Sequence, residues 1–412
     1  MFEKLKRADP EIQKCIVEEK QRQMEGLELI PSENIVSIPV LEALGSFPTN
    51  KYSEGYPGHR YYGGNEIIDK IELFAINRLK KLFGAEHANV QPHSGAIANM
   101  GIYSAFLNPG DKAMGLKLTE GGHLTHGHKV NFSGRFYNFV QYGVSKETEQ
   151  LDYDEIRKMV LLEKPKLVLS GYTAYPRAID FKEFRKICDE AGAYCVADIA
   201  HIAGLCATGH HENPVPYFDA VSTTTNKTLR GPHGGAIMCK KEFAEEIDRA
   251  IFPSLQGGPL ENAIAAKAVA FREALLPEFK IYAGQIIKNS KKLAEELQSY
   301  GYRLVSGGTD NHLMLVDVRK EGIPGIEAER ILDKAGIYCN KNTIPFEKGS
   351  PWDPSGIRLG TPTVTTRGMK ESEMIQIAEF IHKALQSRKD DSKLARIKKD
   401  VREFCKGYVF YE

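Results

Sequence analysis

The sequence lacks closely paired cysteines, a strong net charge and any long apolar run. Its seven cysteines are scattered without a C-x-x-C pair, which favours reduced thiols over a disulfide framework or a zinc site. The 55 basic and 54 acidic residues leave a net charge of +1, so there is no electrostatic basis for binding nucleic acid or an anionic membrane. No apolar run approaches membrane-spanning length, and the first residues lack the apolar core of a signal peptide. We therefore expect a cytoplasmic protein.

Two nucleotide-binding signatures and a complete metal-ligand set are also missing. No G-x-G-x-x-G follows a strand-like run, and no G-x-x-x-x-G-K-[ST] is present, so neither a dinucleotide site nor a phosphate loop is supported. His123, His126 and His128 lie on a glycine-rich stretch without a nearby carboxylate or cysteine to complete a metal site. We expect no metal, and we interpret His123 as an aromatic ring that stacks on a flat cofactor.

The length and the pattern of the chain predict an α/β protein with more than one domain. The 412 residues are 42% hydrophobic and 26% charged, which describes a globular protein too long for one ordinary core. From residue 150 strand-like and helix-like segments alternate, which favours a parallel sheet covered by helices. We expect an N-terminal helical arm (1–26), a large domain (27–276) and a smaller α+β domain (277–412).

Lys227 has surroundings that are unusual for a lysine. An apolar run at 218–221 leads into three threonines, Asn226 and Lys227, and a turn rich in glycine and proline follows. A lysine placed at the end of a buried strand is partly desolvated, which lowers the pKa of its amine and makes it a nucleophile toward carbonyl carbon. The alternative is a lysine that snorkels to solvent at a strand edge.

Further polar groups fall at predicted strand ends and loops. Asp198 ends a predicted strand at 193–197, and ligands of parallel sheets bind beyond the carboxyl ends of the strands. An aspartate beside an aldehyde-binding lysine can hold a pyridine nitrogen protonated, and His201 is placed to reach a ring hydroxyl. Ser94 and Gly95 begin a predicted helix, a place suited to a phosphate. The alternative interpretation of A-D-I-A-H is a helix-capping aspartate and a solvated histidine.

The chain closely resembles serine hydroxymethyltransferase. The matching stretches cover nearly the whole length in order, and they are L-E-L-I-P-S-E-N (27–34), N-K-Y-S-E-G-Y-P-G-H-R-Y-Y-G-G (50–64), N-V-Q-P-H-S-G (89–95), G-G-H-L-T-H-G (121–127), V-N-F-S-G (130–134), A-D-I-A-H-I-A-G (197–204), T-T-N-K-T-L-R-G-P (224–232), Q-G-G-P (256–259), V-S-G-G-T-D-N-H-L (305–313), N-K-N (340–342) and S-G-I-R-L-G-T-P (355–362).

The resemblance implies the fold and the reaction. The fold would be the type I fold of pyridoxal-phosphate enzymes, like aspartate aminotransferase, with a mostly parallel seven-stranded sheet in the large domain and a smaller α+β C-terminal domain. The enzyme would move the hydroxymethyl carbon of serine reversibly to tetrahydrofolate, giving glycine and 5,10-methylenetetrahydrofolate through a pyridoxal-phosphate aldimine and a glycine quinonoid. Its partners would be serine or glycine, tetrahydrofolate and a second copy of the chain, as a homodimer or a dimer of dimers.

The resemblance also implies residue roles. Lys227 would bond to pyridoxal 5′-phosphate, Asp198 would pair with its ring nitrogen, and His123 would stack on the ring. Other implied cofactor contacts are His201, Thr173, Ser94 and Gly95, with Tyr52, Gly257 and Gly258 from a second subunit. The implied substrate contacts are Arg358, Ser32 and Tyr62 at the substrate carboxylate, Glu54 as proton shuttle, and Leu118, Gly122, Leu124, Asn342, Ser350, Pro351 and Trp352 at tetrahydrofolate.

The sequence departs from the family pattern around the implied cofactor. Asn226 stands where histidine is usual, His233 replaces an arginine, and Ala96-Ile97 replaces Ser-Gln. Losing one such contact changes cofactor affinity by about 1–3 kcal/mol. Two alternatives follow: a folate-independent aldolase or transaldolase acting on β-hydroxy amino acids such as threonine, and a non-catalytic paralogue that keeps the fold.

Overall fold

A computed structural model describes residues 2–347 and 353–411 of the chain. Its centre is a seven-stranded sheet that is parallel except for β10, which runs antiparallel to both of its neighbours. The prediction of an α/β fold with a mostly parallel seven-stranded sheet is confirmed. In sheet order the strands are β4 (His87–Asn89), β10 (Gly235–Cys239), β9 (Ala220–Thr224), β8 (Tyr194–Asp198), β7 (Leu167–Ser170), β5 (Lys112–Leu116) and β6 (Asn138–Tyr142).

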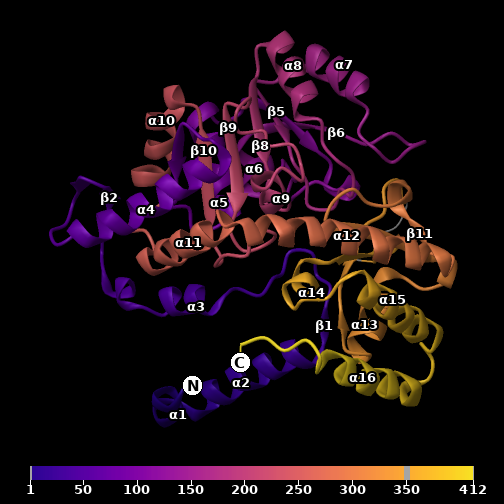
Figure 1. Cartoon of the computed structure of the whole chain (residues 1–412). Helices are drawn as coiled ribbons and strands as arrows, with labels where there is room; N and C mark the ends of the chain where they lie inside the picture. The colour runs from indigo at the N-terminus through magenta and orange to yellow at the C-terminus, as the bar shows by residue number, and fades with distance from the viewer. Residues whose placement is uncertain (1, 348–352, 412) are drawn as a thin grey trace.

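Both faces of this sheet are covered by helices, because its strands are apolar on both sides. Along β7, Leu167 and Leu169 pack into one core with α5, whereas Val168 between them packs into the other core with α4, α8 and α11. Buried strands of this kind occur in parallel sheets that helices cover on both faces. Figure 1 shows the resulting layers around the large sheet. The helices before residue 277 are α1 (Glu3–Ala8), α2 (Pro10–Glu25), α3 (Ile38–Leu44), α4 (Glu66–Phe83), α5 (Gly95–Phe106), α6 (Phe132–Phe136), α7 (Tyr153–Glu163), α8 (Phe181–Ala191), α9 (Ala203–Ala207), α10 (Ala244–Arg249) and α11 (Glu261–Ala274).

A second, antiparallel sheet of four strands organises the C-terminal part. Its order is β11-β12-β15-β14, and its core is separate from the two cores of the large sheet. This confirms the expected smaller α+β unit. The elements are α12 (Pro277–Ser299), β11 (Arg303–Leu304), β12 (Leu313–Asp317), α13 (Gly325–Lys334), β13 (Ile337–Tyr338), β14 (Asn340–Asn342), β15 (Gly356–Gly360), α14 (Pro362–Thr366), α15 (Glu371–Gln386) and α16 (Asp391–Cys405).

The N-terminal segment runs alongside this smaller unit. The short strand β1 (Leu27–Glu28) pairs in parallel with β13, and Leu27 and Leu29 pack into the core of the small sheet. Helix α2 contacts α16, and the two ends of the chain lie near each other in Figure 1. The proposed domain boundaries at 26/27 and 276/277 stay predictions.

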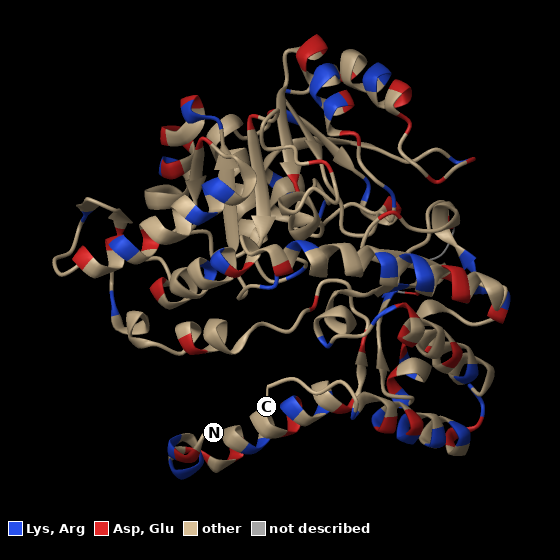
Figure 2. Ribbon diagram, viewed as in Figure 1, with Lys and Arg blue, Asp and Glu red and all other residues tan. Residues whose placement is uncertain are grey.

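Charged side chains follow the outer helices. Figure 2 shows Lys and Arg interspersed with Asp and Glu along α7, α8, α12, α15 and α16, while the strands of the large sheet are mostly free of charge. No helix in residues 2–347 and 353–411 combines the length and apolarity needed to cross a membrane.

Candidate active site

Two adjoining cavities lie where the large sheet meets the small one. The inner cavity has a volume of about 270 Å³ and is lined by Ser32, Gly95, Ala96, Asn99, His123, Tyr172, Thr173, Asp198, Ala200, His201, Thr224, Lys227 and Arg358. The outer cavity, of about 720 Å³, shares Ser32, Gly95, Thr224 and Lys227 with it. Eight residues that the sequence predicted for the site therefore line one cavity: Ser32, Gly95, His123, Thr173, Asp198, His201, Lys227 and Arg358.

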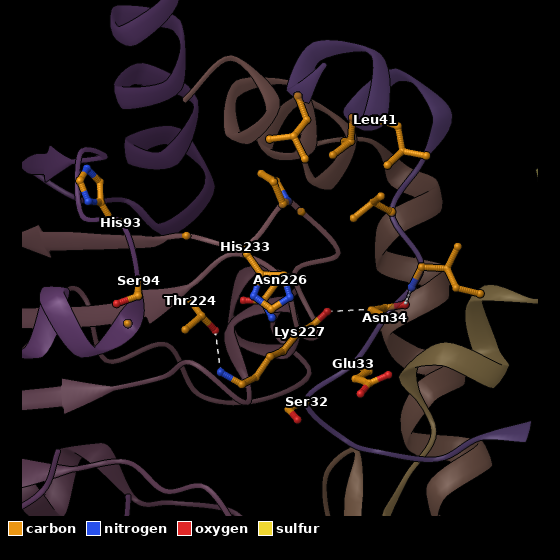
Figure 3. A pocket seen from close by; sticks show the side chains of 18 of the residues that line it. Ser32, Glu33, Asn34, Leu41, His93, Ser94, Thr224, Asn226, Lys227 and His233 are labelled. Carbon is orange, nitrogen blue, oxygen red and sulfur yellow. Dashed lines mark hydrogen bonds between the residues drawn. The ribbon is translucent and has the colours of Figure 1, made fainter. Parts of the chain in front are cut away.

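Lys227 lies three residues beyond β9, on the wall that separates the two cavities. Its Nζ donates a hydrogen bond to Thr224 Oγ1 at 2.9 Å, and its backbone carbonyl accepts one from Asn34 at 2.9 Å (Figure 3). Burial lowers the pKa of Lys227 to about 8, against the opposing effect of the Asp198 charge. A useful fraction of the amine is therefore neutral near pH 8, as a nucleophile requires.

Asp198, the last residue of β8, is held as an anion by two polar side chains. Its Oδ2 accepts hydrogen bonds from Asn99 at 2.8 Å and meets His126 Nε2 at 3.1 Å, while the Ala200 N–H donates to Oδ1 at 3.0 Å. Burial opposes ionisation, but the His126 contact and the Asn99 hydrogen bond outweigh it and place the pKa of Asp198 well below its usual range. A permanent carboxylate of this kind can hold a proton on a heterocyclic nitrogen.

Asn99 and His126 were not among the predicted site residues. Asn99 lies inside an apolar helix, where its sequence neighbours give no sign of function. His126 was visible in the histidine run, but its partner Asp198 is 72 residues away in the chain. No group of three or more potential metal ligands occurs in the part of the chain that the structure describes.

The start of helix α5 lies at the edge of the inner cavity. Ser94 is the capping residue: its Oγ accepts the Ile97 N–H at 3.3 Å, and Gly95 begins the helix. An added Cβ on Gly95 would lie 2.6 Å from Thr224 Cγ2, so only glycine lets these two elements approach so closely. The unpaired N–H groups of a helix start favour a phosphate.

Arg358 enters the same cavity from the small sheet. It lies at the middle of β15, is 6% exposed, and donates hydrogen bonds to Asn340 Oδ1 at 3.0 Å and to the Thr173 carbonyl at 2.7 Å. Burial lowers its pKa to about 10, and no carboxylate of the described residues forms an ion pair with it. A buried guanidinium without an acidic partner is suited to bind a carboxylate of a ligand.

His123 is available as a neutral ring. Its Nδ1 lies 2.7 Å from Thr125 Oγ1, and burial, followed by the charge of His126, lowers its pKa to about 4. The segment that carries it is tied to Thr173, whose N–H donates to the Gly121 carbonyl at 2.9 Å. An uncharged aromatic ring suits stacking on a flat heterocycle.

Tyr52, Glu54 and Tyr62 do not line either cavity of their own chain. They lie together on the exposed loop 50–64, with the Tyr52 and Tyr62 rings 5.1 Å apart, and we call them, with Gly257 and Gly258, the loop cluster. An added Cβ on Gly258 would lie 3.3 Å from the Tyr52 ring, and one on Gly257 would lie 3.1 Å from Glu54 Oε1. Arg60 fixes this loop by donating to the carbonyls of Ser53 and Gly55, on either side of Glu54.

The expected folate residues are only partly located. Leu118, Gly122 and Leu124 follow β5 in one short segment, and Leu124 is 43% exposed. Asn342 ends β14, where its side chain donates to the Thr343 carbonyl at 2.8 Å. None of these four lines the inner cavity. Ser350, Pro351 and Trp352 lie outside the described residues.

Three of the four residues that depart from the family pattern line the cavities. Ala96 lines the inner cavity, and Asn226 and His233 line the outer one (Figure 3). Comparison with protein families shows that the family described as serine hydroxymethyltransferase matches residues 5–381. The match spans every segment that contributes to the two cavities except Tyr411.

Proposed function

We propose that this chain, which belongs to the serine hydroxymethyltransferase family, transfers the hydroxymethyl carbon of serine reversibly to tetrahydrofolate, forming glycine and 5,10-methylenetetrahydrofolate. The family depends on pyridoxal 5′-phosphate and uses tetrahydrofolate. The observation that carries the proposal is the shared cavity of Lys227, Asp198 and Arg358. These are an amine with a lowered pKa, a carboxylate with a lowered pKa, and a guanidinium that forms no ion pair with the described residues.

The residues present fit pyridoxal phosphate. Lys227 would bond to its aldehyde carbon, and Asp198 would hold the proton on its ring nitrogen. The start of α5 at Ser94 and Gly95 would bind the phosphate, and His123 would stack on the ring. His201 and Thr173, which also line the inner cavity, would meet the ring hydroxyl. When bound, this cofactor supplies an electron sink that stabilises negative charge on the substrate carbon.

Other groups of the chain would bind and orient the amino acid. Arg358 offers two parallel N–H groups to the serine carboxylate, and Ser32 lines the same cavity. When the carboxylate is held in one place, the bond of the α-carbon that will break is held in one orientation relative to the cofactor. Such orientation supplies a large part of catalysis. The small volume of the inner cavity limits the water that reaches the reacting carbon.

The loop cluster would act in the cavity of a second copy of the chain. Tyr52, Gly257 and Gly258 would reach the partner's cofactor, Tyr62 the substrate carboxylate, and Glu54 would move the proton of the hydroxymethyl group. The exposure of Tyr52 and Tyr62, and the absence of the whole cluster from both cavities of their own chain, support this assignment. A homodimer is then the smallest unit with complete sites. The carrier of the one-carbon unit would bind near Leu118, Gly122, Leu124 and Asn342.

The test is the fate of serine labelled with ¹³C at its hydroxymethyl carbon, followed by NMR with and without tetrahydrofolate. We expect glycine and labelled methylenetetrahydrofolate to form only when tetrahydrofolate is added. Cleavage of threonine that is rapid and indifferent to folate would instead favour an aldolase. No turnover of either amino acid by protein that holds the cofactor would favour a non-catalytic paralogue.

A further inference from the structure

Two buried histidines meet behind the inner cavity. His201 follows β8 and lines the cavity, and His312 immediately precedes β12 of the small sheet. His201 Nδ1 lies 3.2 Å from His312 Nε2, and the two rings are tilted by 32°. The residues are 5% and 0% exposed. This contact joins the large sheet to the small sheet at the site itself.

Burial and nearby positive charges favour the neutral form of both imidazoles. Burial, and then the charges of Lys227 and Arg358, keep the pKa of His201 well below its usual range; His123 and His312 act in the same direction. Burial, and then Arg358, Lys227 and His211, lower the pKa of His312 to about 3. A neutral imidazole carries a single N–H, so one proton is shared in the contact between the rings.

The surroundings of His312 decide which ring donates. Its Nδ1 is fully buried and has no hydrogen-bond partner among residues 2–347 and 353–411. If His201 donated from Nδ1, His312 would have to carry its proton on Nδ1, as a buried N–H without an acceptor. Orphaned buried N–H groups are rarer in proteins than acceptors that lack a donor. If His312 donates from Nε2, its Nδ1 is a bare acceptor, and His201 then carries its proton on Nε2.

We propose that His312 is a positioning residue that holds His201 as the Nε2–H tautomer, so that His201 presents an N–H donor to the cavity. The tautomer follows from this contact and from the burial of His312 Nδ1, without reference to any cofactor. That the donor serves the cofactor's ring hydroxyl rests on the proposed function. A fixed donor aimed at a developing oxyanion stabilises negative charge without reorganisation.

The turn that carries His312 is rigid without any ligand. Thr309 Oγ1 donates to the Leu313 carbonyl at 2.6 Å, and Asn311 Nδ2 donates to the Tyr175 carbonyl at 2.9 Å. The next residue, Leu313, pairs with Gly360 of β15, two positions beyond Arg358. His312 and Arg358 thus reach the site from adjacent strands, so the small sheet positions the carboxylate clamp and the donor of His201 together.

The direct test is ¹⁵N NMR of histidine-labelled apoprotein at pH 7.5, in which two-bond ¹H–¹⁵N correlations distinguish the tautomers. His201→Gln and His312→Gln assign the two signals. We expect a neutral His201 protonated on Nε2 in the wild type. An Nδ1–H tautomer, or a protonated imidazolium, would overturn the proposal. Because the apoprotein is used, this result is independent of whether serine is turned over.

Two variants of His312 test its role in the holoenzyme. Glutamine can still donate from its amide, whereas leucine cannot. We expect His312→Leu to leave His201 as a mixture of tautomers and to lower kcat/KM for serine by about two- to tenfold, because only the fraction of His201 that keeps the proton on Nε2 presents the donor. His312→Gln should keep the Nε2–H tautomer and restore most of the activity. An unchanged His201 tautomer in His312→Leu would contradict the assignment.

Discussion

Lys227 illustrates how a single residue acquires chemistry from its position. It lies just beyond a buried strand, its only side-chain hydrogen bond in the described chain goes to a neutral hydroxyl, and burial lowers its pKa to about 8. Asp198 shows the opposite outcome for charge. Hydrogen bonds hold its pKa low in spite of burial, so that the carboxylate stays charged. Environments that favour a neutral lysine beside a charged aspartate are typical of functional sites.

The lowered pKa predicts a pH dependence for cofactor loading. Only the neutral amine attacks an aldehyde, so the rate at which apoprotein captures pyridoxal phosphate should rise with pH through about 8 and level off above it. Stopped-flow absorbance between pH 6.5 and 9.5 measures this rate. Pyridoxal, which has no phosphate to titrate, is the control. A midpoint near the ordinary lysine value, or a flat profile, would contradict the assigned environment.

At the scale of elements, close approaches between strand ends hold the site groups in place. Gly171 follows β7 with φ +112°, and an added Cβ would lie 2.0 Å from the Asp198 carbonyl oxygen. The β7–β8 pair can therefore present Asp198 to the cavity only with glycine at this position.

Gly209 provides a matched control for Gly171. It also has a positive φ, +74°, but nothing lies within 4 Å of its added Cβ. Gly209→Ala should cost about 1 kcal/mol of unfolding free energy, from backbone strain alone. Gly171→Ala should cost about 3 kcal/mol or more, because the collision adds to the strain, and it should weaken cofactor binding. Denaturant unfolding measures the free energies, and cofactor titration measures the binding. Equal effects of the two substitutions would contradict this explanation.

Lys267 of α11 fixes the backbone beneath the start of α5. It is 2% exposed, and its Nζ donates to the carbonyls of Val90, Pro92 and Gly235 at 2.7, 3.0 and 2.9 Å. These carbonyls belong to the segments that flank Ser94 and Gly95. The lysine thus ties β10 to the loop that leads into α5.

Lys267→Met should lower the unfolding free energy by about 3 kcal/mol, because three buried carbonyls lose their donor. Lys81→Met, on the exposed face of α4, should change it by no more than about 0.5 kcal/mol. Urea unfolding of the two apoproteins makes the comparison. A Lys267→Met protein as stable as the wild type would show that the ammonium does not hold these segments.

The ends of helices depend on local signals in the sequence, whereas parts of the site depend on contacts between distant residues. Asp9 caps α2 through the Ile12 N–H, and Gly84 ends α4 with φ +71°, because both depend on neighbours in the chain. The alternation of strands and helices in the sequence also predicted that the site lies at the carboxyl ends of the strands. Neither Lys267, which lies among alanines, nor His312, which ends a polar turn, was predicted. Their hydrogen-bond partners are distant in the sequence and come close only in the folded chain.

At the scale of the whole molecule, the site is assembled from parts far apart in the chain. The large sheet supplies Lys227 and Asp198, the small sheet supplies Arg358, and the loop cluster lines neither cavity of its own chain. This arrangement is expected of a dimer whose sites combine residues of two copies. It also explains why the loop 50–64 is well ordered by Arg60 and yet exposed.

Mixed dimers test this arrangement. If Glu54 acts in the partner's cavity, a dimer of one Lys227→Ala chain and one Glu54→Gln chain keeps one intact site. Random mixing of the two inactive variants should then restore about a quarter of wild-type activity per chain. Serine turnover after refolding an equimolar mixture measures it, with each variant refolded alone as the control. No activity in the mixture would place Glu54 and Lys227 of the same chain in one site.

On the proposed function, the Lys227 amine holds the cofactor in the cavity that it shares with Asp198. Borohydride reduction of the loaded protein fixes the bond between lysine and cofactor, and mass spectrometry of its peptides then locates the added pyridoxyl group. We expect one modified residue per chain, Lys227, and none in the Lys227→Ala protein. A pyridoxyl group on another lysine, or none on the wild type, would contradict it.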